Sequence, residues 1–404
     1  MREKVSVIYT DSRIEYQENK LKAFQRTSTQ STSYRVYEAD KVGIYCHIGQ
    51  CGDEEGYEKA KENLLERARP YPFEIESGVR KRDMTERELT DKELMNTAKE
   101  CMDYLMECYP KFIHRMIVNQ SKEIYAQTND KGMDYEYIDC CVSVMVEFKH
   151  VDSKDISNGY FSFSLRDYDK EVFQKMADNY LANYDKELEL PEEIIIDMQY
   201  YDLLGKLYSC LNYENMSLGT SLLSGKIGEK VFSGEFTLMH DVSEKECWFN
   251  RFWDGDGCVH ENDKFVYIEN GVLLSGFSDK RTSKKYNVPH TKNAYHNDVD
   301  IPGPGGLNLR IKRSEKKVKE LLNGRYCIIP AYMGGGGFAD NGDYAVPIQY
   351  AFLSDGEKIL GRVPAFTMVS NLFDIFGKDF VGVGSDNPIY NDKQILFRVK
   401  KGEI

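Results

Sequence analysis

The sequence has no long uninterrupted apolar run. Its first residues, Met1 to Arg13, are charged and lack the apolar stretch of a secretory signal. No apolar run elsewhere approaches the roughly 20 residues that a transmembrane helix needs. We therefore expect no membrane association and a cytoplasmic location.

Basic residues are in deficit. Lys and Arg together number 53 against 66 Asp and Glu, which gives a formal net charge of -13. A surface with this balance repels phosphate backbones wherever salt does not screen it. We therefore expect no nucleic-acid partner.

The cysteines show no metal-binding or disulfide spacing pattern. The 10 cysteines are scattered, with no C-x-x-C pair and no tight framework of the kind that small secreted domains use. This distribution predicts thiols that are reduced and mostly buried.

Two common catalytic signatures are also missing. Ser217, Ser221 and Ser224 lie in a conspicuous segment, but none of them stands in G-x-S-x-G. The glycine run Gly334–Gly337 lacks the lysine and hydroxyl residue of a phosphate-binding loop. These absences argue against a serine hydrolase and against a nucleotide site.

The length and the local patterns indicate two domains. A chain of 404 residues exceeds the usual size of one domain, and its 41% hydrophobic content supports ordinary globular cores. Proline and charge interrupt the pattern at Leu190–Glu193. We therefore predict domains at residues 1–190 and 191–404.

The first domain combines strands and helices. Tyr137–Lys149 alternates apolar and polar residues as a strand with one buried face does. Helices are expected at Glu54–Arg69, at Asp167–Leu188, and from Thr90, where Thr90 and Glu93 form a capping box, to about Cys108. By itself this mixture indicates only an α+β fold.

The second domain is organised around an apolar helix and a glycine-bearing motif. Leu203–Leu211 carries leucines at helical spacing, and Ser221–Glu229 reads Ser-x-x-Ser-Gly-x-x-Gly-Glu. A strand is expected to follow up to Leu238, and Asn270-Gly271 predicts a hairpin between apolar strands. A helix is expected near Thr367–Phe376.

The motif at Ser221–Glu229 resembles the catalytic-domain core of the TldD/PmbA family of peptidases. Further segments match the family in type and spacing: Asp254–Gly257, Ile268–Leu273, Thr291–Asn293, Asn341–Asp343 and Ser370–Asp374. The resemblance implies an N-terminal antiparallel sheet with a helix pair and a strand-rich, barrel-like or sandwich C-terminal domain.

The resemblance also implies what the chain lacks. Metal-dependent members carry H-E-x-x-x-H on the helix before the motif, and the corresponding positions here are Leu204, Gly205 and Ser209. They also use a cysteine near the C-terminus as a third zinc ligand, and no cysteine follows Cys327. The chain thus resembles the non-metal PmbA or TldE type. We expect no cofactor and no catalytic residue in this chain, with zinc only in a partner subunit.

The family resemblance supplies the candidate binding residues. It implies that glycine-bearing strands line a channel in which an unfolded peptide adds as an extra strand, held by main-chain hydrogen bonds. In the turn Thr291-Lys-Asn293, lysine stands where the family usually has glycine. The candidate substrate-binding residues are Gly334, Gly335, Gly336, Gly337, Asp254, Gly257, Thr291 and Asn293.

Histidines of the second domain offer a competing interpretation. Cys258-x-His260 together with His290-x5-His296 could in principle bind zinc, and His240 and Cys247 lie nearby in the sequence. These spacings fit no closed zinc motif, so solvated or packed histidines are the favoured interpretation.

Three functional hypotheses follow. The preferred one is a metal-free subunit that pairs with a TldD-like, zinc-bearing homologue and helps form a chamber that degrades unfolded peptides. The second is a homodimeric peptide-binding protein without hydrolytic activity. The third is an unrelated zinc hydrolase built on His260, His290 and His296.

Overall fold

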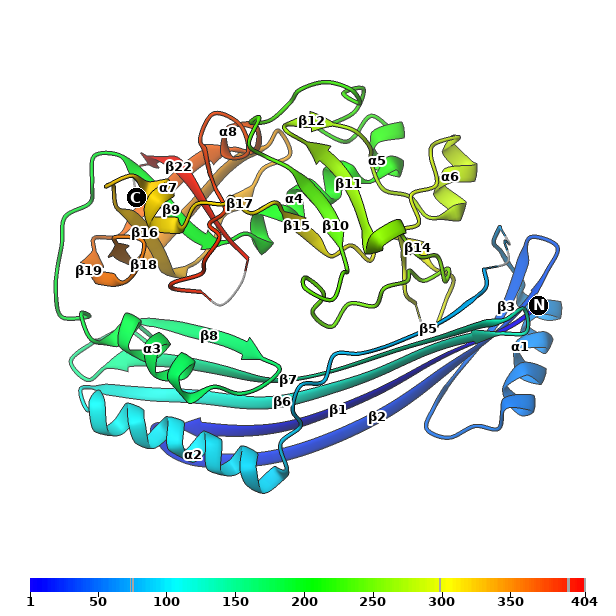
Figure 1. Ribbon diagram of the computed structural model, residues 1–404, viewed down its shortest axis with the longest axis horizontal. Helices are drawn as coiled ribbons and strands as arrows, with labels where there is room; N and C mark the ends of the chain where they lie inside the picture. The colour runs from blue at the N-terminus through cyan, green and yellow to red at the C-terminus, as the bar shows by residue number, and fades with distance from the viewer. Residues whose placement is uncertain (73, 75, 298, 391–392, 403–404) are drawn as a thin grey trace.

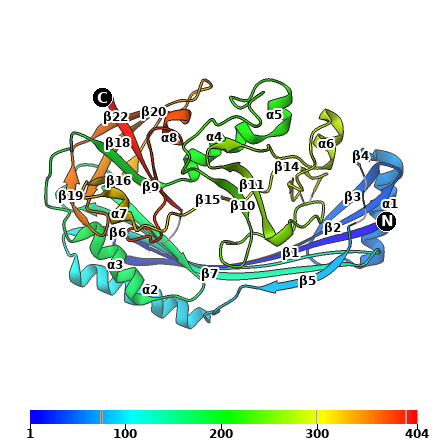
Figure 2. The ribbon, with the colours of Figure 1, turned by 45° about the horizontal axis from the view of Figure 1, so that its top comes forward.

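The computed structural model of the chain describes residues 1–72, 74, 76–297, 299–390 and 393–402. It is a mixed α+β structure with two large sheets (Figures 1 and 2), which confirms the predicted fold class. No helix among the described residues is both long and apolar enough to cross a membrane.

The N-terminal half forms one long, curved sheet that runs beneath the rest of the molecule in Figure 1. Its strand order is β4-β3-β2-β1-β6-β7-β5, and β8 also pairs with β7. The pairings are antiparallel except that of β5 with β7. The strands are β1 (Arg2–Gln17), β2 (Lys20–Glu38), β3 (Lys41–Ile48), β4 (Arg69–Pro70), β5 (Gly78–Asp83), β6 (Phe112–Asn129), β7 (Met133–His150) and β8 (Gly159–Leu165).

Three helices accompany this sheet: α1 (Asp53–Arg67), α2 (Asp91–Cys108) and α3 (Lys170–Leu181). The capping box predicted at Thr90 and Glu93 is present, with the Glu93 amide donating to Thr90 Oγ1 at 3.3 Å. The helix expected at Asp167–Leu188 is shorter at both ends. It begins only at Lys170 because Asp169, as the N-cap, accepts the first-turn amide of Glu171.

Strand β7 buries its two faces against different partners. Val144, Val146 and Phe148 belong to the core that includes α2 and α3. Tyr135 and Tyr137 have the opposite parity and pack with residues of the C-terminal half. The sequence predicted one buried face, whereas the C-terminal half covers the other. The C-terminal half thus packs directly against one face of the N-terminal sheet.

The C-terminal half contains a closed five-stranded barrel. The strands follow the order β16-β9-β22-β20-β18, and β16 pairs with β18 to close it. The strands of this sheet are β9 (Ile194–Gln199), β16 (Cys327–Met333), β17 (Gly337–Phe338), β18 (Asp343–Ser354), β19 (Ile359–Val363), β20 (Phe366–Asn371), β21 (Phe380–Gly382) and β22 (Gln394–Gly402).

A smaller sheet and short helices complete this half. The four-stranded sheet has the order β12-β11-β10-β15, and β13 pairs with β14. The remaining elements are β10 (Leu238–Asp241), β11 (Lys264–Glu269), β12 (Val272–Leu273), β13 (Ala294–Tyr295), β14 (Gly303–Pro304), β15 (Leu309–Ile311), α4 (Tyr201–Leu211), α5 (Tyr213–Ser217), α6 (Lys280–Tyr286), α7 (Val318–Leu322), α8 (Leu372–Ile375) and the 3-10 turn η1 (Glu261–Asp263).

The central motif does not lead directly into a strand. The predicted hairpin at Asn270-Gly271 joins β11 to β12, but residues 229–237 form turns rather than a long strand. Gly228 and Val231 donate their amides to Leu273 and Gly271, at 2.8 and 2.9 Å. Backbone hydrogen bonds therefore hold the motif against the β11–β12 hairpin.

Helix α4 lies in the main core of this half. Its leucines are buried with apolar residues of the barrel and of the smaller sheet. The helix predicted at Leu203–Leu211 is confirmed. Its exposed side borders the space between the barrel and the N-terminal sheet, which is where the candidate site lies.

Candidate functional site

The glycine run connects β16 to β17 and lines a cavity of about 580 Å³. Strand β17 is the last strand in the order of its sheet. The described lining residues come from the run, from β8, from α4 and from β16 to β18: Tyr160, Tyr201, Asp202, Gly205, Pro330, Ala331, Tyr332, Met333, Gly334, Gly335, Gly336, Gly337, Phe338, Tyr344 and Val346. The structure thus brings all four predicted glycines to one cavity.

Gly336 is where a glycine is required. Its φ is +100°, and a Cβ at this position would lie 2.2 Å from the carbonyl oxygen of Ala345. A Cβ at Gly335 or Gly337 would instead meet nothing within 4 Å. The run therefore packs closely on β18 at one point and leaves open space beside its backbone at two others.

Three exposed aromatic rings line the same cavity. Tyr160 is 51%, Tyr201 52% and Tyr332 44% exposed. Tyrosine offers a broad apolar face and a hydroxyl, so it contacts varied side chains at little cost in conformational entropy. Asp202 is the one carboxylate among the described lining residues. The described lining thus combines glycine backbone, tyrosine rings and one carboxylate.

The three positions that correspond to the family's H-E-x-x-x-H motif lie on different sides of helix α4. Leu204 is buried in the main core at 6% exposure. Gly205 lines the glycine cavity, and Ser209 is exposed on the helix. None of the three offers an imidazole, thiolate or carboxylate, so this helix carries no metal donor at those positions.

The acidic turn at Asp254 serves the fold. Asp254 Oδ1 accepts from the amides of Asp256 and Cys258 at 3.0 and 2.8 Å, and its Oδ2 accepts from the Ala294 amide at 2.9 Å. Gly257 has φ +80° and faces the end of the Met133 side chain of the N-terminal sheet. Neither residue is among those that line the glycine cavity.

Thr291 and Asn293 are likewise buried and fully engaged. Thr291 Oγ1 accepts from the Ser278 amide at 2.7 Å. Asn293 Oδ1 accepts from the Tyr267 hydroxyl at 2.6 Å, and its Nδ2 lies 3.3 Å from His260 Nε2. The structure gathers these two residues near the Asp254 turn, away from the glycine cavity.

One group of potential metal ligands lies among the described residues. Carboxylate, thiol and imidazole ligand atoms of Asp254, Cys258 and His290 are within 4.8 Å of one another. Cys258 Sγ donates to Glu76 Oε1 at 3.3 Å, and Lys280 Nζ lies 3.6 Å from the same oxygen. Burial raises the pKa of the Cys258 thiol strongly, so the thiol is protonated in the metal-free protein. The Lys280 ammonium, paired with Glu76, places a positive charge beside this group of potential ligands.

The other candidate histidines have protein partners. His296 is half-buried, and its Nε2 donates to the Trp253 carbonyl oxygen at 3.1 Å. His240 Nδ1 accepts from the Asn308 amide at 3.0 Å. Burial lowers the pKa of His260 to about 4 and that of His240 to about 3, so both are neutral at physiological pH. These rings are packing and hydrogen-bonding groups of the fold.

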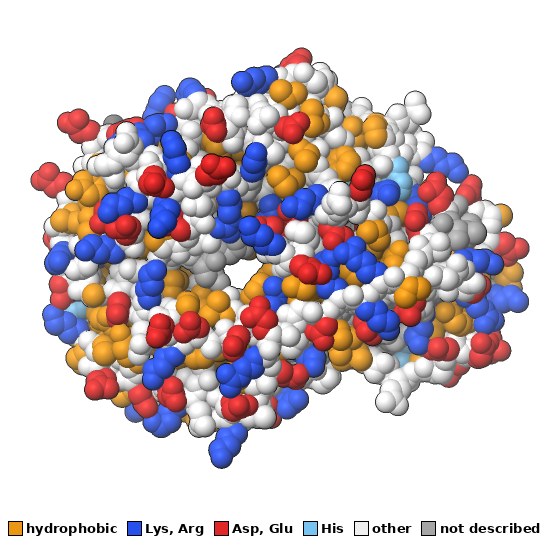
Figure 3. Space-filling model, in the orientation of Figure 1, with side chains coloured by type: hydrophobic (Ala, Val, Ile, Leu, Met, Phe, Trp, Pro, Cys, Tyr) orange, Lys and Arg blue, Asp and Glu red, His pale blue; other side chains and the backbone are white. Residues whose placement is uncertain are grey.

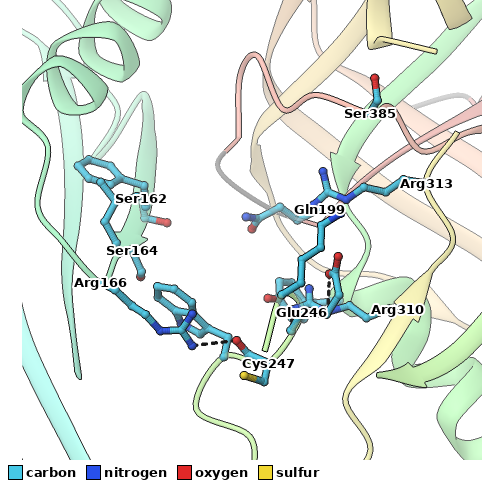
Figure 4. Close-up of a pocket in the computed structure, with 14 residues that line it drawn as sticks. Ser162, Ser164, Arg166, Gln199, Glu246, Cys247, Arg310, Arg313 and Ser385 are labelled. Carbon is cyan, nitrogen blue, oxygen red and sulfur yellow. Dashed lines mark hydrogen bonds and ion pairs between the residues drawn. The ribbon is translucent and has the colours of Figure 1, made fainter. Parts of the chain in front are cut away.

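A second cavity, of about 480 Å³, adjoins the first, since Tyr201 lines both. Figure 3 shows the molecule hollowed at its centre, with Lys and Arg side chains on the rim. Figure 4 shows residues of β8 facing basic residues of the C-terminal half across this space. Sequence reasoning missed this cavity because Arg166, Lys245, Arg310 and Arg313 are far apart in the chain and form no local pattern.

Comparison with known proteins decides the family. Residues 193–395 match the model of the PmbA/TldA metallopeptidase C-terminal domain, which covers half of the chain. The chain belongs to the PmbA/TldD family. The resemblance inferred from the motif is thereby confirmed.

Similar structures cover the whole fold of this PmbA/TldD-family chain. The crystal structure of TldE from Thermococcus kodakarensis superposes with a TM-score of 0.78 at 18% identity, over 99% of this chain and 96% of that one. A Thermotoga maritima structure gives 0.75 at 19% identity, over 99% and 95%. An uncharacterized protein of Methanocaldococcus jannaschii is 23% identical over 369 residues, which are 88% of this chain and 84% of that protein. These likenesses establish the fold.

Proposed function

We propose that this chain is the metal-free subunit of a TldD/TldE-like peptidase complex and binds an extended, unfolded peptide in its glycine cavity. The observation that carries the proposal is the pairing of exposed glycine backbone with three exposed tyrosine rings around one cavity. The zinc and the water-activating carboxylate would come from a homologous partner chain.

The backbone at the glycine run suits a peptide strand. In the described residues β17 pairs only with β18, which leaves its other edge open. Peptides that add to an open edge are held by main-chain hydrogen bonds, which recognise no particular side chain. This mode suits a substrate class defined by being unfolded rather than by sequence.

The helix positions support a division of labour between subunits. Gly205 borders the cavity at the position where metal-dependent relatives carry glutamate, and it has no side chain. A catalytic zinc needs about three protein ligands and an open site for water. The lining of this cavity has Asp202 as its one carboxylate among the described residues and no histidine or cysteine.

Reconstitution tests the proposal. The chain, an H-E-x-x-x-H-bearing homologue from the same organism, and their mixture are each assayed on an unstructured peptide, with and without chelator. We expect the mixture to exceed the summed activities of the separate chains. A mixture no more active than its parts, with peptide still bound by this chain, would favour the homodimeric peptide-binding protein instead.

A further inference from the structure

The cavity beside Tyr201 carries a net positive charge although the chain as a whole is acidic. It is lined by the basic residues Arg166, Lys245, Arg310 and Arg313 and by one acid, Glu246. The whole chain carries a formal charge of -13. A recess with this local excess of positive charge focuses the field and concentrates anions inside it.

Two of the arginines are held in place by the fold. The Arg166 guanidinium donates to both carboxylate oxygens of buried Asp139 at 2.8 Å, and Nη2 also donates to the Cys247 carbonyl oxygen at 2.9 Å. Arg310 is 5% exposed and lies 3.5 Å from a carboxylate oxygen of Glu246. Because these two side chains are already ordered in the folded chain, binding an anion costs them little further conformational entropy.

The other two basic residues are more accessible. Arg313 is half-buried and Lys245 is exposed. Within the part of the chain that the structure describes, no ion pair involves Lys245. Figure 4 places Arg313 and Gln199 on the wall opposite Ser162 and Ser164 of β8. The Ser162 hydroxyl is exposed at this wall, whereas Ser164 Oγ is engaged with Ser143 Oγ at 2.8 Å.

The cationic cavity continues the glycine cavity. Tyr201, at the start of α4, lines both. A peptide that lies along the glycine run and continues past Tyr201 would reach the basic side chains. A peptide with a free C-terminus carries a carboxylate there, and arginine can bind a carboxylate with paired hydrogen bonds.

We propose that the cavity lined by Arg166, Lys245, Arg310 and Arg313 binds a carboxylate of the peptide held along the glycine run. This inference rests on the proposed peptide-binding function and adds a substrate class to it. The carboxylate comes from the C-terminus of the peptide or from an acidic side chain, and both present the same group to the arginines. The chain thus selects peptides by negative charge as well as by lack of structure.

Binding measurements with matched peptides test this inference. The full-length chain, with any chains that co-purify, is titrated with a fluorescent unstructured peptide of neutral side chains. The peptide carries either a free C-terminal carboxylate or a C-terminal amide. We expect the free acid to bind about tenfold more tightly at low salt, and the difference to shrink as salt is raised. An amide peptide with one internal Glu that regains this affinity would identify an acidic side chain as the source of the carboxylate.

The double variant Lys245→Gln with Arg313→Gln removes two accessible charges and leaves the buried Asp139–Arg166 pair in place. We expect it to bind the free-acid and amide peptides within about twofold of each other, with amide affinity unchanged. The matched control, Lys131→Gln on the exposed β6–β7 turn, should keep the full difference.

Two results would overturn the inference in different ways. Equal affinity for the acid and amide peptides in the parent chain would contradict carboxylate recognition and leave peptide binding intact. Absence of binding for every peptide, in a chain with native circular dichroism, would contradict the proposed function and this inference with it.

Discussion

Asp139→Asn should destabilise the protein far more than an ordinary surface substitution. Asp139 lies in β7 and is fully buried. Besides the two hydrogen bonds from Arg166, it accepts from the Tyr137 hydroxyl at 2.7 Å and from the amides of Cys140 and Phe249, both at 3.0 Å. The carboxylate therefore ties the N-terminal sheet to the C-terminal half through Phe249.

The size of the loss in unfolding free energy follows from the interactions that asparagine cannot make at this position. Asparagine has nearly the same shape, but one carboxylate oxygen becomes an NH₂ group that faces donors, and the negative charge opposite the Arg166 guanidinium is lost. The Arg166 side chain is only 10% exposed. Breaking a buried pair in this way costs about 3–5 kcal/mol. Single unsatisfied donors cost about 1–3 kcal/mol each, and these overlap with the first figure rather than add to it.

Urea denaturation followed by circular dichroism measures this loss. The matched control is Asp185→Asn, whose carboxylate pairs with Lys111 at 2.6 Å on the surface, with both side chains more than half exposed. It should cost less than about 1 kcal/mol. The double variant Asp139→Leu with Arg166→Met should recover part of the loss, since no charge is left buried alone. A loss for Asp139→Asn as small as that of the control would refute a dry interface at this position.

Three further predictions concern pH, metal and the glycine run. Burial raises the pKa of Asp197 to about 8. Between about pH 4 and pH 8 the folded chain therefore holds a proton on Asp197 that the unfolded chain has released. The stabilisation from this group falls by about 1.4 kcal/mol for each pH unit across that range. Asp197→Asn should flatten that part of the stability profile measured by thermal unfolding, and an unchanged profile would contradict the assignment. The purified chain should contain no stoichiometric zinc by elemental analysis. The triple variant Leu204→His, Gly205→Glu and Ser209→His should show no chelator-sensitive peptidase activity. The reason is that Leu204 points into the core while Ser209 is exposed, so the two new histidines would not face one metal. Gly336→Ala should lower the melting temperature and weaken peptide binding because of its positive φ and the close β18 carbonyl; parent-like values for both would show that the run tolerates a Cβ.

Local signals in the sequence predicted local structure well. The capping box at Thr90 and the Asn270-Gly271 hairpin depend on neighbouring residues, and both are present. The helix expected at Thr367–Phe376 was largely wrong. Residues up to Asn371 instead form β20, because they pair with β18, a partner distant in the sequence; only α8 (Leu372–Ile375) is helical.

Some parts of the candidate site could likewise be predicted from the sequence, and others could not. The glycine run was recognisable as a continuous segment, and its residues lie together in one cavity. Thr291 and Asn293 matched a family pattern, but the structure shows them buried in hydrogen bonds of the fold. The cationic cavity could not be predicted, because Arg166 and Arg313 line one cavity only when the barrel is placed over the sheet.

The most direct test of the central proposal is affinity purification of this chain from its native host, with identification and stoichiometry of the chains that remain bound. A metal-free subunit should recover an equimolar homologue that carries H-E-x-x-x-H together with about one zinc per pair of chains. Recovery of this chain alone, as a homodimer without zinc, would contradict the subunit role.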